Sequence, residues 1–341
     1  MRKLFISFAL VAGIIFIITQ IQDFGSIIDT VKRADLRFLL LAILVQSVWL
    51  LNVAALYRSI YRVLGIEESL VQMMLTAASA NFVNVVTPTA GVGGMAIFIS
   101  EARRKEYSSG RTTVASAMFV LFDYAGFLMV LALGLIVLFR RDKLQVPELA
   151  ASGVLLLIAL VIASLLYLGM YSEQKLGRFL ASGATLVNKI ARPIQRDKTI
   201  DYLSLDRAFT FARDVADGMR ELRGKPRELI LPMLLALSSK VLLIIVLLFV
   251  FLAFGVPPSL GTLIAGFSIA FLFMIVSPSP SGVGFVEGAL TLALASFYIP
   301  LSDAAVITIA YRAITFWLPL LIGMVAIRRL DSPTNNHQIK T

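Results

Sequence analysis

The sequence of 341 residues contains no cysteine and only one histidine, His337, which lies in a polar C-terminal stretch. Without cysteine there is no disulfide, no thiolate nucleophile and no iron–sulfur ligation. A single histidine argues against a histidine-based metal site. We therefore predict no metal and no other cofactor.

Charge is also scarce. Charged residues make up 15% of the chain, 58% of it is hydrophobic, and the mean hydropathy is +0.87. Soluble domains are typically about 45–50% apolar and about 25% charged. One globular core cannot hide so large an excess, whereas a bilayer accepts apolar surface on every side. The composition predicts an all-α integral membrane protein.

Six stretches are apolar over the length needed to cross a bilayer, about 20 residues. They are 4–22, 38–57, 113–139, 149–171, 229–254 and 303–327. The first begins as a signal peptide does, with Met1-Arg2-Lys3 before an apolar run. Because no small-residue cleavage site follows, we interpret it as an uncleaved span.

Two further apolar stretches, 70–99 and 260–299, are interrupted by proline and glycine, the first at 87–94 and the second at 277–284. Proline removes a backbone donor and glycine permits a sharp turn, so each stretch predicts a broken helix pair. Because broken backbone cannot face lipid, we expect two re-entrant hairpins enclosed by the other helices.

Positive charge predicts the orientation of the chain. With both termini in the cytoplasm, the cytoplasmic segments hold 23 Lys and Arg and the opposite side holds 6. Arg140-Arg141 on the outer side is an exception. The net charge of +10 is thus explained by topology and by attraction to anionic head groups, without nucleic acid.

We predict one membrane domain over residues 1–330, with a first half of about 1–171 and a second half of 229–330. Between them, residues 172–228 carry apolar residues at helical spacing among arginines, which predicts an amphipathic cytoplasmic connector. It either lies on the membrane face or docks anionic lipid or a partner. Residues 331–341 are expected to form a disordered tail.

The two breaks resemble one another. Val86-Thr87-Pro88 matches Val276-Ser277-Pro278 at an offset of 190, and Gly91-Val92-Gly93 matches Gly282-Val283-Gly284 at 191. In the predicted topology the two hairpins enter from opposite sides. Similar elements of opposite sidedness indicate an inverted repeat, whose broken helices form the substrate site in transporters.

The residues at the breaks carry a family resemblance. At the first break, Asn84-Val85-Val86-Thr87-Pro88 precedes Gly91-x-Gly93-Gly94. At the second, Pro278-x-Pro280-Ser281-Gly282-Val283-Gly284-Phe285-Val286-Glu287 is followed by Tyr311-Arg312 in the last span. The chain resembles, over roughly 4–327, the lysylphosphatidylglycerol synthase transmembrane-region family. This is the flippase-like half of the bacterial multiple peptide resistance factor, which also occurs as stand-alone proteins.

The resemblance implies translocation of lipids, such as aminoacylated phosphatidylglycerol or polyprenyl-linked sugars, between leaflets. The soluble aminoacyl-transferase domain of the resistance factor is missing from this sequence, so tRNA-dependent lipid synthesis is not expected. Ser281 stands where the family has a second Gly, and Glu101 where its first half often carries Arg. An acid therefore follows each break, Glu101 the first and Glu287 the second.

Four ionisable residues lie within the spans: Asp123, Lys240, Glu287 and Arg312. A charge at the bilayer centre costs about 2.5–3.5 kcal/mol, so these two acids and two bases are expected to pair or to face a cavity. Arg312 is the strongest substrate-binding candidate, because its rigid fork of donors suits a lipid phosphate. The alternative is a structural salt bridge to Glu287 or Asp123.

The other three have two interpretations each. Glu287 either pairs with Arg312 until substrate displaces it, or takes up a proton as a coupling step. Asp123 is either a proton- or cation-coupling residue or a structural partner. Lys240 either contacts phosphate or extends its long stem toward the interface.

A helix that begins after a glycine-rich turn presents free N–H groups to an anion. We therefore add the residues of both breaks to the predicted substrate site: Pro88, Gly91, Gly93, Gly94, Pro278, Pro280, Gly282 and Gly284. Asn81 and Asn84 are expected to satisfy backbone groups that the first break leaves free.

We predict a flippase or lipid transporter of the cell (inner) membrane that moves an anionic phospholipid or a polyprenyl-phosphate-linked lipid between leaflets. The alternatives are an ion-coupled carrier of a small solute, a membrane transferase, and a scaffold for an enzyme of lipid or glycan synthesis. Enzymatic activity is not expected, because the loops offer no acid–base pair, metal-ligand cluster or nucleotide loop. The predicted partners are membrane lipids with anionic head groups.

Overall fold

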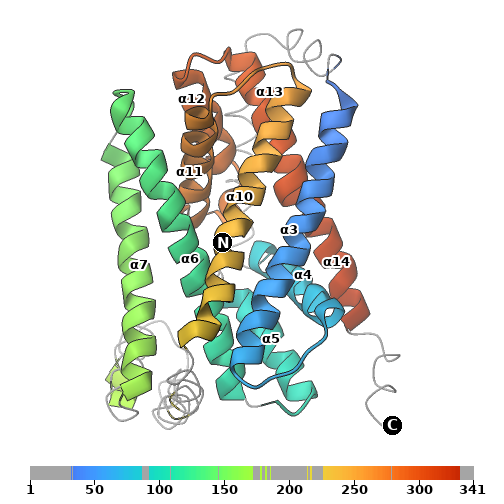
Figure 1. The fold of residues 1–341 in the computed structure, drawn as a ribbon, viewed down its shortest axis with the longest axis vertical. Helices are drawn as coiled ribbons and strands as arrows, with labels where there is room; N and C mark the ends of the chain where they lie inside the picture. Colours follow the sequence, from blue (N-terminus) through green and yellow to red (C-terminus); the bar gives the residue numbers. More distant parts are fainter. Residues whose placement is uncertain are drawn as a thin grey trace, which may run out of the picture.

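The computed structural model describes residues 34–86, 92–107, 109–144, 146–171, 226–277 and 279–330, with a few scattered positions at 32 and between 177 and 216. Every regular element in these ranges is a helix (Figure 1). The α-helices are α3 (Leu36–Val63), α4 (Leu70–Val86), α5 (Val92–Arg104), α6 (Ser109–Arg140), α7 (Val146–Tyr171), α10 (Ile230–Ala253), α11 (Leu260–Val276), α12 (Phe285–Ser296), α13 (Leu301–Arg312) and α14 (Leu318–Leu330).

Three short turns complete the path of the chain. A 3₁₀ turn, Pro226–Leu229, precedes α10, and another, Pro280–Gly282, lies between α11 and α12. A π-helical turn, Ala313–Trp317, joins α13 to α14. The prediction of an all-α membrane protein is confirmed.

Among the described residues, five segments are long and apolar enough to cross a membrane: Leu36–Val63, Gly110–Arg140, Val146–Leu168, Arg227–Ala253 and Leu301–Leu330. They coincide with five of the six predicted spans, so the chain is a multi-pass membrane protein. The predicted span 4–22, most of the connector 172–228 and the tail 331–341 lie outside the described residues.

The two interrupted stretches form two pairs of short helices. α4 packs against α5, and α11 packs against α12. In Figure 1, α4 and α5 lie at one end of the bundle, and α11 and α12 lie at the opposite end. The predicted broken helix pairs are confirmed, and they have the opposite sidedness that an inverted repeat requires.

The repeat extends to the ends of the helices. α3 and α10 both end before a left-handed glycine, Gly65 and Gly255, each with a φ of 69°. After each glycine, the next N–H returns to a carbonyl five residues earlier, which closes the same C-terminal turn. α4 and α11 then begin after Ser69 and Ser259, whose hydroxyls both accept an N–H at 3.1 Å. The members of each pair are 190 residues apart.

The two halves interlock through their long helices. α3 packs along α10, α4 packs against α14, and α11 packs against α6. A Cβ added to Gly323 of α14 would lie 2.4 Å from the Ala78 carbonyl oxygen of α4, and one added to Gly134 of α6 would lie 2.3 Å from Ser268 Oγ of α11. Matching glycines thus let the first arm of each hairpin closely approach a spanning helix of the other half.

Arg141, which the charge pattern leaves on the poorly basic side, is bound to the start of α11. Its guanidinium donates to Ser259 Oγ at 2.8 Å and to Thr262 Oγ1 at 3.1 Å. It also lies 5.1 Å from the centre of the Phe297 ring. These contacts give this arginine a structural role at the base of the second hairpin.

Candidate functional site

The second break is a turn of fixed conformation rather than a bent helix. Ser281, Gly282 and Gly284 have φ values of 49°, 72° and 85°, all in the left-handed region. At Gly282 a Cβ would lie 2.4 Å from Val286 Cγ2 and 3.0 Å from Met274 Cα, so only glycine fits there. Ser281 is not a glycine, so its left-handed conformation costs on the order of 1 kcal/mol.

Glu287 connects this turn to the last span. It lies in the first turn of α12, where its Oε2 accepts the N–H of Gly284 at 2.7 Å. Its Oε1 accepts a hydrogen bond from Arg312 Nε, also at 2.7 Å. One carboxylate therefore caps the start of α12 and neutralises a buried guanidinium.

Arg312 ends α13 and is only 4% exposed. Besides its bond to Glu287, its Nη2 donates to the Ser281 carbonyl oxygen at 3.2 Å. Its guanidinium carbon lies 4.4 Å from the centre of the Phe316 ring. Phe316 belongs to the π-helical turn, and such turns within α-helices occur frequently at functional sites.

Lys240 and Asp123 form a second ion pair in the bundle interior. Lys240 Nζ of α10 lies 2.5 Å from Asp123 Oδ1 of α6 and 4.1 Å from the centre of the Phe271 ring of α11. Lys240 is 2% exposed, whereas the Asp123 side chain is 21% exposed. The expectation that Lys240 extends toward the interface is wrong, because a carboxylate and an aromatic face hold it inside.

At the first break, a backbone N–H that the sequence analysis assigns to ligand binding already has a side-chain partner. α5 begins at Val92, so Gly93 and Gly94 lie in its first turn. The Gly94 N–H donates to Asn84 Oδ1 at 2.5 Å, and a Cβ at Gly94 would lie 2.6 Å from Asn84 Nδ2. Asn84 therefore satisfies backbone freed by the break, as expected.

The structure unites part of the predicted site. Four of its residues meet at the second break: Arg312, Glu287, Gly282 and Gly284. Pro280 lies in the turn beside them, while Pro88, Gly91 and Pro278 lie outside the described residues. Glu101 is no counterpart of Glu287, because it lies near the far end of α5 and pairs with Arg104 at 2.9 Å.

Sequence reasoning missed the π-helical turn and the ring of Phe316 under Arg312. The apolar pattern of 303–327 is continuous, and one extra residue in a helical turn leaves no mark in composition. Only the combination of a deeply placed arginine and an aromatic four residues later, on the same helix face, carried a signal.

The charged groups of this site can exchange their ionic partners. Within the described residues, no three His, Cys, Asp or Glu side chains lie close enough to hold a metal ion. The four charges in the spans instead form two pairs of opposite sign. An anion can replace Glu287 at the guanidinium, and a proton can neutralise the carboxylate it displaces.

Two inverted halves, each with a broken helix pair, define a multi-pass helical membrane protein. The chain belongs to the family described as "Lysylphosphatidylglycerol synthase TM region", whose family model matches residues 4–323. The resemblance carried by the two break motifs is thereby confirmed.

Curated relatives of the chain occur in archaea. A UPF0104 membrane protein of Methanothermobacter thermautotrophicus is 23% identical over 311 residues, which cover 89% of this chain and 88% of the relative. A second one from the same organism is 24% identical over 331 residues, covering 95% and 92%. A UPF0104 membrane protein of Pyrococcus horikoshii is 24% identical over 308 residues, covering 88% and 89%. The similarity thus spans nearly the whole length of both chains in each comparison.

Proposed function

We propose that the protein is a flippase or lipid transporter that moves an anionic phospholipid or a polyprenyl-phosphate-linked lipid between leaflets. The observation that carries this proposal is the position of Arg312, which is 4% exposed and lies at a backbone break. Its partner there is a carboxylate, Glu287, that an anionic group can replace. A guanidinium binds phosphate through two parallel N–H groups, which suits this exchange.

Glu287 stabilises the site when no lipid is bound. A lone guanidinium within a bilayer is costly, so the ion pair keeps Arg312 in place between substrates. When a phosphate arrives, it takes over the guanidinium, and Glu287 keeps its bond to the Gly284 N–H. The acyl chains remain in the membrane while the head group crosses.

The same proposal covers location and partners. The protein lies in the cell (cytoplasmic) membrane with both termini in the cytoplasm, in accord with the excess of Lys and Arg in the segments assigned to that side. It acts as a carrier rather than an enzyme. Its partners are membrane lipids with anionic head groups and an enzyme of lipid or glycan synthesis that makes or uses the transported lipid.

Mass spectrometry of co-purified lipids tests the proposal. We expect the wild type to enrich one phosphate-bearing lipid, Arg312→Lys to retain less of it, and Arg312→Gln combined with Glu287→Gln to lose it. The double variant leaves no unpaired charge and should insert normally. Arg140→Ala, an exposed arginine, is the matched control and should bind as the wild type does.

Equal amounts of bulk lipid on every variant would overturn the lipid assignment. In that case the same site would have to serve a small anionic solute. Uptake of radiolabelled solutes into vesicles would then be the next measurement.

A further inference from the structure

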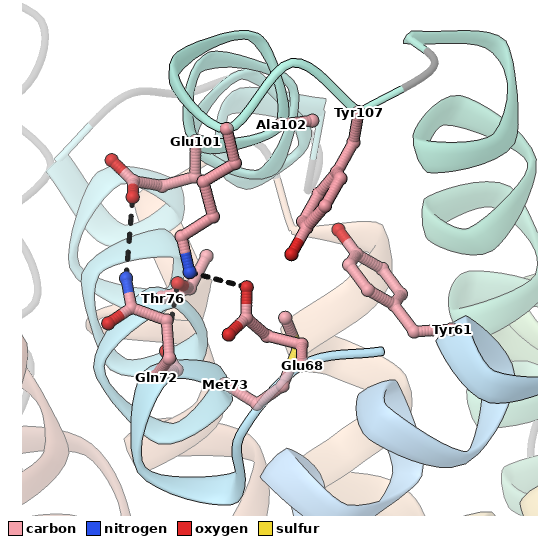
Figure 2. A pocket seen from close by; sticks show the side chains of 9 residues that line it. Tyr61, Glu68, Gln72, Met73, Thr76, Glu101, Ala102 and Tyr107 are labelled. Atoms are coloured by element: carbon pink, nitrogen blue, oxygen red, sulfur yellow. Dashed lines mark hydrogen bonds and ion pairs between the residues drawn. The ribbon is translucent and has the colours of Figure 1, made fainter. Parts of the chain in front are cut away.

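Polar side chains that stabilise a fold bond to one another or to the backbone. Figure 2 shows such a cluster at the base of the first hairpin, where Lys105 donates to Glu68 and Gln72 donates to Glu101. Five other residues have buried side-chain N or O atoms without a hydrogen-bond partner among the described residues: Gln46, Trp49, Ser79, Ser268 and Thr308. A buried polar group without a partner costs stability and requires an explanation.

Helix packing explains the two serines. A Cβ at Gly134 would lie 2.3 Å from Ser268 Oγ, so α11 needs a small residue where it crosses α6. Ser79 follows Ala78, whose carbonyl oxygen meets Gly323 at the other close crossing. Both serines are fully buried, and their small size suits these crossings.

Packing does not explain Gln46 of α3. Its side chain is 0% exposed, and neither its amide nitrogen nor its amide oxygen has a partner in the part of the chain that the structure describes. Leucine has a similar volume and would avoid the cost of burying the amide. Trp49, one turn later on the same helix face, leaves its indole N–H unpartnered among those residues as well.

Asn52 shows how an amide on the same helix behaves when it supports the fold. Its Nδ2 donates to the Leu235 carbonyl oxygen at 2.8 Å, and its Oδ1 accepts the Ser238 hydroxyl at 3.0 Å. These bonds join α3 to α10. Gln46 makes no equivalent bond to any described residue, so it does not hold α3 in place in this way.

Thr308 of α13 departs from the usual behaviour of a hydroxyl within a helix. Thr315 donates to the Tyr311 carbonyl oxygen, one turn earlier, at 2.8 Å. Thr308 is 0% exposed and makes no such bond within the described ranges. It lies one turn before Arg312 on the same helix face, so its hydroxyl is on the side of α13 that carries the guanidinium.

The helices that carry these three residues meet at one apolar cluster. Trp49 packs against this cluster from α3, and Ile307 and Tyr311 belong to it from α13. α3 also packs against the π-helical turn that follows Arg312. The unpartnered groups therefore belong to helices that adjoin one another beside the Arg312 site.

The positions of Gln46 and Thr308 give the direction of a path. They lie in the first halves of α3 and of the span Leu301–Leu330. In Figure 1 both of these helices begin at the end of the bundle where α11 and α12 lie. The path would therefore run from Arg312 toward the end of the bundle that holds the second hairpin.

The chemistry of the three side chains defines what the path accepts. Each of them can donate a hydrogen bond and none is charged, which suits an oxygen-rich group such as a phosphate. We infer that Gln46, Trp49 and Thr308 line the path of the lipid head group between Arg312 and this end of the bundle. The apolar cluster closes the path in the present conformation. The inference rests on the proposed function, which supplies the head group.

Replacing Gln46 separates a role in the path from a structural role. Gln46→Leu removes an unsatisfied amide, so it should unfold at a higher SDS fraction than the wild type in mixed micelles. Its transport should fall about tenfold, the effect of one hydrogen bond lost in transit. The probe is phosphatidylglycerol with a fluorescent acyl chain in liposomes, followed by quenching with dithionite. Asn52→Leu, the matched control, removes bonds to α10 and should unfold at a lower SDS fraction.

Introduced cysteines test the path without any lipid substrate, because the chain has no cysteine of its own. Gln46→Cys and Thr308→Cys should be labelled in membrane vesicles by sulfonatoethyl methanethiosulfonate, an anionic reagent that does not enter lipid. Ser116→Cys is the buried control. Ser116 is 1% exposed, and its hydroxyl bonds to the Thr112 carbonyl oxygen at 3.0 Å, so a thiol there should not be labelled.

The outcomes separate this inference from the proposed function. If both thiols are labelled but the wild type moves no phosphatidylglycerol, the polar path stands and the lipid assignment alone fails. The inference is overturned if Gln46→Leu destabilises the protein as Asn52→Leu does, or if it transports the probe at the wild-type rate. It is also overturned if the thiols at 46 and 308 are labelled no faster than the thiol at 116.

Discussion

Removing one partner of the Lys240–Asp123 pair should destabilise the protein more than removing both. Lys240 is 2% exposed, so Asp123→Asn leaves an ammonium inside the bundle with the Phe271 ring, 4.1 Å away, as its remaining partner. Breaking a buried ion pair costs about 3–5 kcal/mol. A desolvated cation–π contact retains about 2 kcal/mol, so we expect the loss to lie near the lower limit, about 3 kcal/mol.

The reverse change should cost less. Lys240→Met leaves the Asp123 carboxylate, whose side chain is 21% exposed and can recruit water or a proton. An uncompensated polar group of this kind costs about 2 kcal/mol. Asp123→Asn combined with Lys240→Met removes both charges and keeps the volumes similar, so its stability should return to within about 1 kcal/mol of the wild type.

Equilibrium unfolding in mixed micelles of increasing SDS fraction measures these differences. Each single variant should unfold earlier than the double variant. If the losses of the two single variants simply add in the double variant, the two charges do not interact and the pairing is refuted. A stable double variant that no longer transports would show that this charged pair acts in transport as well as in stability.

Two further predictions concern the second break and the helix crossings. Glu287→Gln frees Arg312 from its ion pair, so binding of an anionic lipid should tighten about tenfold, measured by native mass spectrometry. Gly323→Ala drives a methyl group against the Ala78 carbonyl and should cost about 1–3 kcal/mol in the same unfolding assay, whereas Gly153→Ala, with open space around it, should cost nothing.

The spans and the broken pairs were predictable because their signals are local. Apolar length marks a span, and proline and glycine within an apolar run mark a break. The partner of Arg312 was not predictable, because Glu287 and Asp123 are both acids within spans and sequence does not give their distances.

The comparison of the two halves separates what the fold needs from what function adds. Gly134 and Gly323 are 189 residues apart, and each lets two helices approach closely. The helix ends and caps also have the same structural role in both halves. Asp123 and Arg312 have the same separation and carry opposite charges.

The caps of the two breaks differ in the same sense. Asn84, a neutral amide, caps the first break, whereas Glu287, an ionisable carboxylate, caps the second and holds the arginine. Protonation of Glu287, or an anion that replaces it at the arginine, can therefore loosen the second break. Asn84 carries no charge, so neither change acts on the first break. Because an inverted fold alone would treat its two halves alike, we propose from this asymmetry that the response to substrate lies at the second hairpin.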